Sequence, residues 1–157
     1  MKYKNILVPF DGSDHARDAL KAAEDLVAGV EGAHITILNV IASSDINPTF
    51  GTDNPFWSSA DLMGYDEYKD YMKRVIDSAK SGLEASVHDD LERLGDKASV
   101  DVIAYPGAAR GIAEYVGDHD IDLIVMGRRG LGALRGMLGS VSYGVLGSVD
   151  VPVLTIK

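Results

Sequence analysis

Short apolar runs alternate with amphipathic segments along most of the chain. Continuous apolar runs, typical of parallel strands buried on both faces, predict strands over residues 3–8, 34–40, 98–105, 121–126 and 151–156. Apolar residues at three- and four-residue intervals predict helices over residues 14–28, 66–94, 108–116 and 140–147. This alternation predicts an α/β fold with a parallel sheet and right-handed crossovers.

One irregular stretch, from Ala42 to Tyr65, interrupts the alternation. It is rich in asparagine, proline, glycine and serine, so regular structure is not expected there. Its aromatic side chains Phe50, Phe56 and Trp57 favour a lid or a contact with a partner protein, while a variable surface insertion fits equally well. A chain of 157 residues predicts one domain, over residues 1–157, with this insertion at about 42–65.

The last predicted strand has the composition of a sheet edge. Pro152 cannot donate a hydrogen bond to a neighbouring strand, which indicates an edge position. An apolar edge strand promotes aggregation unless it is covered. Pairing of Val151–Ile156 with the same strand of a second subunit would cover it, and we expect a homodimer of this kind. The alternative is an edge blunted by Pro152 and Lys157 alone.

Charge and composition exclude several classes of function. The net charge of −9 argues against binding to nucleic acid or to an anionic membrane, because both require a cationic surface. Cysteine is absent, which excludes disulfides and thiolate metal sites. The N-terminus lacks the apolar core of a signal peptide, and no stretch approaches the ~20 apolar residues of a membrane span. We therefore expect a cytoplasmic protein.

Two strand exits carry unusual chemistry. After the fourth strand, Gly127 begins a loop with five glycines and three arginines (Gly127, Gly130, Gly132, Gly136 and Gly139; Arg128, Arg129 and Arg135), and Ser140 then opens a helix. A glycine loop leading into a helix N-terminus is suited to bind phosphate. The turn from Pro9 to Ser13 follows the first strand. In an open α/β sheet both loops would line one crevice if strands one and four are neighbours.

The roles of individual residues in this crevice remain open. Asp11 could accept a hydrogen bond from an adenine amino group or a ribose hydroxyl, or help to hold a metal, and Val40 could pack on the base. Taken singly, the glycines fit a simple turn, Ser140 an N-cap, Asp11 a turn residue and the arginines a solvated surface. The combination within one loop of an acidic protein favours phosphate binding.

Familiar catalytic and nucleotide motifs are missing from the sequence. There is no G-x-x-x-x-G-K-[ST], and the segment from Gly130 to Gly136 is one residue too long for G-x-G-x-x-G. No Ser-His-Asp or Cys-His set is indicated. The four histidines lie in separate predicted elements without metal-ligand spacing. We predict no catalytic residue and no protein metal site.

Several blocks resemble the universal stress protein family. They are Ile6–Ser13 (ILVPFDGS), Gly107–Ile112 (GAARGI), Asp122–Gly130 (DLIVMGRRG), Gly139–Ser142 (GSVS) and Val151–Leu154 (VPVL). The resemblance extends over the chain apart from Ala42 to Tyr65. It implies a five-stranded parallel sheet with helices on both faces and strand order 3-2-1-4-5, as in adenine nucleotide alpha hydrolase-like folds. It also implies a dimer through the last strand.

One subclass of that family binds ATP. The resemblance therefore implies that this chain binds ATP together with Mg²⁺. The subclass pattern has nine residues between its second and third glycines, and here eight separate Gly130 from Gly139. By position, the nucleotide contacts would be Pro9, Asp11, Val40, Met126, Gly127, Gly130, Gly139, Ser140, Val141 and Ser142, and Arg129 joins them as a cation of the loop.

The expected function is therefore a regulatory, stress-response module that binds ATP at the carboxyl ends of strands one and four. At most, slow hydrolysis is expected, because the sequence offers no strong general base or nucleophile. Two alternatives remain. One is a dimeric interaction module of the same fold that binds no nucleotide. The other is an enzyme that acts on a nucleotide or a phosphorylated metabolite in the same crevice.

Overall fold

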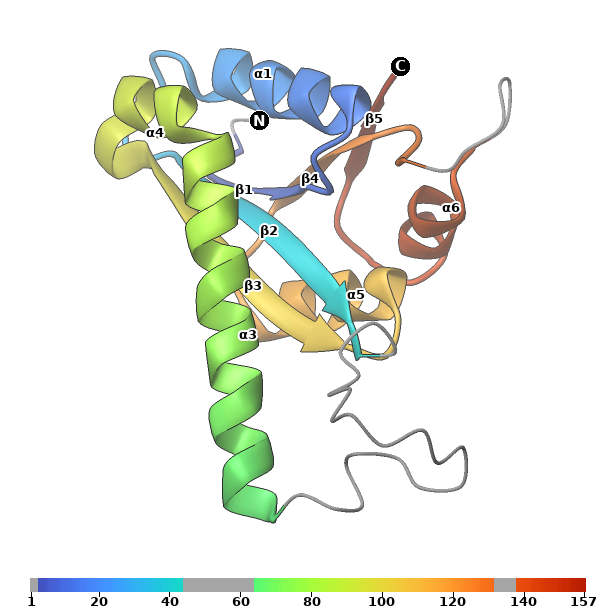
Figure 1. Ribbon diagram of the computed structural model, residues 1–157. Helices are drawn as coiled ribbons and strands as arrows, with labels where there is room; N and C mark the ends of the chain where they lie inside the picture. The colour runs from blue at the N-terminus through green and yellow to red at the C-terminus, as the bar shows by residue number, and fades with distance from the viewer. Residues whose placement is uncertain (1–2, 44–63, 132–137) are drawn as a thin grey trace.

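The computed structural model describes residues 3–43, 64–131 and 138–157. Its five strands form one parallel sheet in the order β3-β2-β1-β4-β5 (Figure 1), which confirms the predicted fold class and strand order. In chain order the elements are β1 (Asn5–Pro9), α1 (Asp14–Val27), β2 (His34–Ala42), α3 (Tyr65–Ser86), α4 (His88–Leu94), the 3-10 turn η2 (Gly95–Lys97), β3 (Ala98–Tyr105), α5 (Ala108–Asp118), β4 (Leu123–Gly127), α6 (Ser140–Leu146) and β5 (Val153–Ile156).

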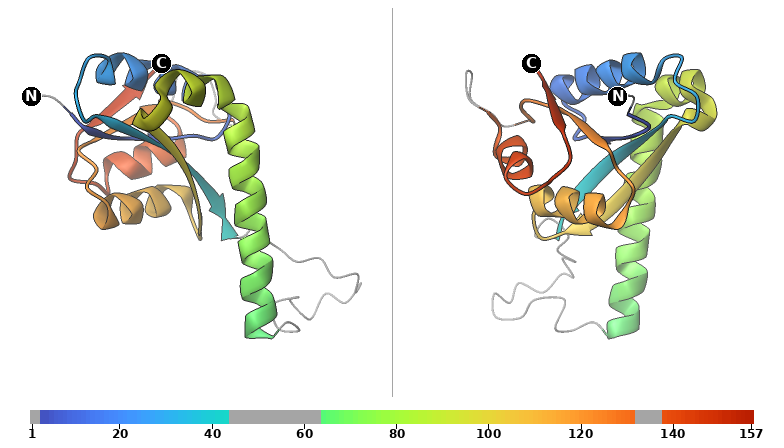
Figure 2. Two further views of the ribbon diagram at one scale, coloured as in Figure 1. Left: turned by 90° about the vertical axis from the view of Figure 1, so that its left-hand side faces the viewer. Right: turned by 180° about the vertical axis from the view of Figure 1, so that it is seen from behind.

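Helices cover both faces of the sheet. Ile6 and Val8 of β1 point to a core shared with α1, α3 and α4, while Leu7 between them points to a second core shared with α5 and α6. This alternation is the two-residue period of a strand. All three side chains are fully buried, as expected for a central strand between two helical layers. The two layers are visible in Figure 2.

Helix α1 begins where the sequence predicted it. The hydroxyl of Ser13 accepts a hydrogen bond from the Ala16 amide at 3.2 Å and so caps the helix. Ala19 and Ala23 on its inner face are fully buried. Their small side chains let the helix lie close to the sheet, where it packs mainly on β4 and β1.

The long helix predicted over residues 66–94 is two helices in the structure. Its continuity is broken at Val87, where φ is −118° and ψ is 21°. The Val87 side chain is 1% exposed in the first core. The change of direction there lets Leu91 and Leu94 of α4 pack on the same core, whereas a straight helix would carry them past the sheet (Figure 1). Helical periodicity continues across the break, so the sequence pattern alone did not reveal it.

Other boundaries differ by a few residues. Helix α5 continues through Gly117 to Asp118. The last strand was predicted over Val151–Ile156 with Pro152 inside it, but β5 is Val153–Ile156. Pro152 lies just before the strand, and its carbonyl accepts a hydrogen bond from the Ile124 amide at 3.0 Å. The predicted edge position of this strand is confirmed by the strand order.

Most of the predicted insertion at 42–65 lies outside the described residues, as do the loop residues Gly132, Arg135 and Gly136. Among the helices within residues 3–43, 64–131 and 138–157, none has both the length and the apolar content needed to cross a lipid bilayer.

Candidate functional site

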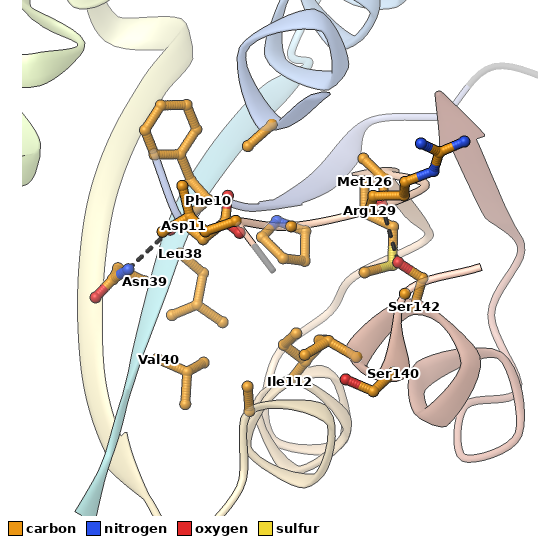
Figure 3. Close-up of a pocket in the computed structure, with 18 of the residues that line it drawn as sticks. Phe10, Asp11, Leu38, Asn39, Val40, Ile112, Met126, Arg129, Ser140 and Ser142 are labelled. Carbon is orange, nitrogen blue, oxygen red and sulfur yellow. Dashed lines mark hydrogen bonds between the residues drawn. The ribbon is translucent and has the colours of Figure 1, made fainter. Parts of the chain in front are cut away.

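A cavity of about 510 Å³ opens at the carboxyl ends of β1, β2 and β4, beside the first turns of α5 and α6. Figure 3 shows side chains from these elements facing it. Every residue predicted to contact a nucleotide lines this cavity: Pro9, Asp11, Val40, Met126, Gly127, Arg129, Gly130, Gly139, Ser140, Val141 and Ser142. The pairing of β1 with β4 brings the two predicted loops together.

The turn after β1 forms one wall of the cavity. Gly12 has a φ of +80°, a conformation that favours glycine. The Asp11 carboxylate accepts a hydrogen bond through Oδ1 from the Ser13 amide at 3.0 Å. Its other oxygen, Oδ2, lies so close to Gly130 that a Cβ atom on that glycine would overlap it. Asp11 therefore spans from the turn to the glycine loop that follows β4.

Gly127 has a packing role that the sequence reading missed. A Cβ atom at Gly127 would lie 2.8 Å from the backbone carbon of His15. The end of β4 and the first turn of α1 can therefore approach closely only because Gly127 has no side chain. We expected this glycine to let the backbone approach phosphate. Gly127 does line the cavity, but the close approach of α1 already requires that this position has no side chain.

The start of α6 forms the opposite wall. The N-cap is Gly139, so Ser140 is the first helical residue and not the cap. The Gly139 amide donates to the Arg128 carbonyl at 2.9 Å, which joins the two ends of the glycine loop. Ser142 is 2% exposed, and its hydroxyl donates to the Gly127 carbonyl at 2.9 Å. That hydroxyl proton therefore fixes α6 to the end of β4.

The charges at the cavity are few and opposite in sign. Among the described lining residues, Asp11 is the single carboxylate and Arg129 the single cationic side chain. The Nε atom of Arg129 is buried and has no hydrogen-bond partner. Arg129 also lies against Gly139, where a Cβ atom would be 3.3 Å from its Cα. This contact is made by the backbone of Arg129, and Figure 3 shows its guanidinium pointing away from Ser140 at the start of α6.

The inner part of the cavity is apolar. Leu38, Val40, Ile112 and Met126, all from the second core, line it (Figure 3). Helix α5 comes close to β2 because Gly111 has no side chain, since a Cβ atom there would lie 2.8 Å from Cγ1 of Val40. An apolar inner part and a polar rim suit a ligand with a flat hydrophobic part and an anionic part.

Sequence reasoning missed several lining residues, namely Phe10, Ala16, Leu38, Asn39, Ala108, Ile112, Leu131 and Leu138. Two signals in the sequence pointed to some of them. Pro106 and Gly107 follow a strand and precede a helix, so the start of α5 had to lie at the carboxyl edge of the sheet. Asn39 is a polar residue near the end of an apolar run.

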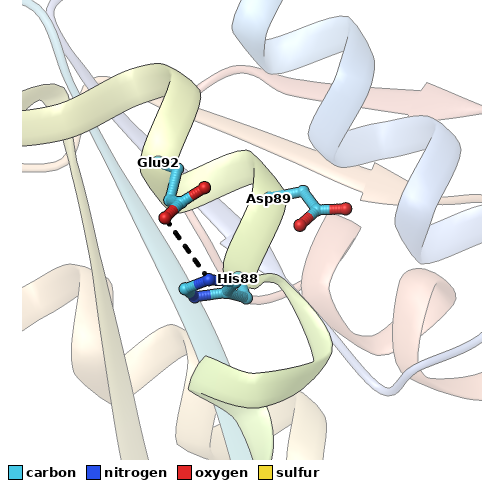
Figure 4. A group of neighbouring side chains, drawn as sticks. All are labelled: His88, Asp89 and Glu92. Carbon is cyan, nitrogen blue, oxygen red and sulfur yellow. Dashed lines mark ion pairs between the residues drawn. The ribbon is translucent and has the colours of Figure 1, made fainter.

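A second polar cluster lies on α4, away from the cavity (Figure 4). His88, Asp89 and Glu92 are all exposed, and their ligand-type atoms lie within 4.8 Å of one another. The histidines show no metal-ligand spacing in the sequence, but in the structure His88 lies beside these two acids. His88 Nε2 lies 3.4 Å from Glu92 Oε1, in an i,i+4 pair typical of a solvated helix face.

A family model and several named relatives identify one family. The sequence model of the family described as "Universal stress protein family" matches residues 2–157. The universal stress protein in the QAH/OAS sulfhydrylase 3′ region of Thermus aquaticus is 28% identical, with 99% of each chain covered. The solved structure of the hypothetical protein MJ0577 is 27% identical, with a TM-score of 0.72 and coverage of 100% of this chain and 97% of that one.

Two other similar structures were solved with a nucleotide. A universal stress protein in complex with cAMP is 17% identical, with a TM-score of 0.62 and coverage of 100% of this chain and 98% of that one. A universal stress protein from Archaeoglobus fulgidus in complex with dAMP is 19% identical, with a TM-score of 0.55 and full coverage of both chains. At these identities the similarity shows the fold.

Proposed function

Since this chain belongs to the universal stress protein family, we propose that it binds an adenine nucleotide, ATP with Mg²⁺, in the cavity between β1 and β4. One observation carries the proposal: all the residues that the sequence predicted as nucleotide contacts line one cavity. The solved relatives with cAMP and dAMP support the choice of ligand, because both ligands contain adenine and phosphate.

The cavity suggests how the ligand would lie. The apolar side chains of Leu38, Val40 and Met126 would hold the base, and the rim at Gly130, Gly139 and Ser140 would face the phosphates. The carboxylate of Asp11 has a suitable position to accept from a ribose hydroxyl or an amino group. As a hard oxygen ligand beside phosphates, it could also help to hold Mg²⁺.

We propose a regulatory output for this binding, not an enzymatic one. The described lining offers the hydroxyls of Ser140 and Ser142 as nucleophiles, and no described lining residue is a histidine or a lysine that could activate them. Ligand occupancy would instead bias the loops around the cavity and, through them, a surface recognised by a partner protein. In line with the composition, the proposed location is the cytoplasm.

We also propose a homodimer through the open edge of β5. That edge carries Leu154, which is 39% exposed, and it pairs with β4 on its other side. At the opposite edge of the sheet, the carboxylate of Asp101 accepts from both the Val102 amide and the Tyr115 hydroxyl, at 2.8 and 2.9 Å. A backbone donor of β3 is therefore already occupied by a side chain, which favours β5 as the pairing edge.

Isothermal titration calorimetry of the purified protein with ATP and Mg²⁺ tests the proposal. We expect saturable binding of ATP and weaker binding of GTP. A Gly130→Ala variant should bind ATP more weakly, because its methyl group would overlap Asp11 Oδ2 and displace that carboxylate. The matched control is Gly117→Ala, whose methyl group meets nothing within 4 Å, and it should bind as the unmodified protein does. The absence of heat at millimolar ATP would refute nucleotide binding.

A second candidate function is an interaction module that binds no nucleotide. The exposure of Tyr143 (74%) and Leu146 (46%) on α6 favours it, because both are large apolar side chains on one short helix. In that case the Gly130→Ala variant would retain partner binding. Release of ADP or AMP at ~10 per second, a typical enzymatic turnover, would instead indicate an enzyme.

A further inference from the structure

Asn39 of β2 holds the chain at the point where β1 ends. Its side-chain nitrogen Nδ2 donates to the Phe10 carbonyl at 2.8 Å. The Phe10 amide in turn donates to the Leu38 carbonyl, also at 2.8 Å. Both backbone polar groups of Phe10 are therefore bound to β2, one residue beyond the last register pair of β1 with β2, Pro9 with Leu38. The side-chain amide of Asn39 extends the strand pairing by one step.

These two hydrogen bonds on Phe10 determine the position of Asp11. Phe10 is 4% exposed, and its ring is part of the first core, so the residue before Asp11 is fixed by packing and by both hydrogen bonds. Asp11 then bonds through Oδ1 to the Ser13 amide, which leaves Oδ2 directed at Gly130. Figure 3 shows the Asn39 nitrogen on the side of Phe10 and Asp11. The carbonyl that Asn39 binds therefore belongs to Phe10, the residue directly before Asp11, whose carboxylate faces the cavity.

We propose that Asn39 is a positioning residue for the ligand, acting through Asp11. The inference rests on the proposed nucleotide site. Its chemistry requires a donor at position 39, because the group it meets is a carbonyl oxygen. An aspartate there would place a carboxylate beside that oxygen, and the two acceptors would repel each other. The turn would then move, and Asp11 would leave the position from which it meets the ligand.

A double-mutant cycle on ATP affinity tests this role. Asn39→Ala removes the donor without adding charge and should weaken ATP binding about threefold to tenfold, the range of one net hydrogen bond. Asn39→Asp should weaken binding more than tenfold. In an Asp11→Ala background, Asn39→Ala should change the affinity by less than about twofold, because the group that Asn39 positions is gone.

A matched control makes the same chemical change elsewhere. Asn5→Asp adds the same charge at the amino end of β1 and should leave ATP affinity unchanged. Urea unfolding shows whether each variant is folded. If Asn39→Asp does not fold, the test rests on Asn39→Ala alone. The Asn39→Ser variant retains a donor and should bind ATP more tightly than Asn39→Ala does.

Three results would overturn the inference. Equal weakening in both backgrounds would show that Asn39 acts independently of Asp11. Unchanged ATP affinity in the Asn39→Ala variant would show that the hydrogen bond from Asn39 to Phe10 does not position the ligand. In both cases the unmodified protein binds ATP, so the proposed function stands and this inference alone fails. If the unmodified protein does not bind ATP, the proposed function fails and this inference fails with it.

Discussion

Replacement of Gly144 by alanine should reveal how tightly α5 and α6 pack. Gly144 lies in the middle of α6, where alanine would ordinarily stabilise a helix by about 1 kcal/mol relative to glycine. Here a Cβ atom would lie 2.7 Å from Cβ of Ala109 on α5. Carbon atoms in contact stand at about 3.5–4.0 Å, so the two helices would have to separate by about 1 Å.

The size of the effect follows from these two opposing contributions. Over-packing of this kind costs about 1–3 kcal/mol, because a Cβ atom cannot rotate away as the end of a long side chain can. After the gain in helix propensity of about 1 kcal/mol, Gly144→Ala should range from neutral to about 2 kcal/mol destabilising. Gly82→Ala in α3, where the added methyl group meets nothing within 4 Å, should show the gain alone.

Equilibrium unfolding in urea gives the comparison directly. We expect the urea midpoint of Gly82→Ala to rise and that of Gly144→Ala to stay equal or fall. Each shift in midpoint equals the change in the free energy of unfolding divided by the m-value, about 1–3 kcal/mol per molar urea. The double variant Gly144→Ala/Ala109→Gly should be more stable than the sum of the two single effects predicts, because the smaller residue at position 109 makes room for the new methyl group. The packing argument would be refuted if Gly144→Ala stabilised the protein as much as Gly82→Ala does.

Three further predictions concern other contacts. Ser142→Ala should lower the free energy of unfolding by about 1–3 kcal/mol in urea, because it leaves the buried carbonyl at the end of β4 without its donor; an unchanged midpoint would contradict this. Burial and the hydrogen bond to Asp101 raise the pKa of Tyr115 from 10.0 to about 12, so its contribution to stability is fully present below pH 10 and is lost as the pH rises toward 12. Tyr115→Phe should therefore flatten the loss of stability between pH 10 and 12, and parallel curves for both proteins would refute the assignment. Leu154→Asp should convert the proposed dimer to a monomer in analytical ultracentrifugation, because it places like charges on a self-pairing edge, and an unaltered sedimentation coefficient would argue against pairing through β5.

The sequence predicted the sheet and the location of the cavity because both depend on local patterns. Buried parallel strands have continuous apolar runs, and loops at the carboxyl ends of neighbouring strands must meet. Helix α1 could be placed from its cap, since Ser13 and the periodic alanines lie close together in the chain. These features need no knowledge of distant contacts.

The features that the sequence did not reveal depend on tertiary contacts. The break at Val87 arises from the shape of the core under α3 and α4, and the apolar periodicity is the same with or without it. The packing role of Gly127 requires His15, which is more than a hundred residues away in the chain. The bond from Asn39 to Phe10 depends on the register of two strands, which no single-strand pattern contains.

The junction of the C-terminal strand with the glycine loop has a practical consequence. The Arg128 amide, at the first step of that loop, donates to the Ile156 carbonyl at 2.6 Å, and Lys157 follows directly. A fluorophore attached at position 157 would therefore sit next to the cavity rim and respond to ligand in the neighbouring loop. A bulky group at position 157 would crowd the same rim, whereas one placed before β1 would lie at the amino edge of the sheet.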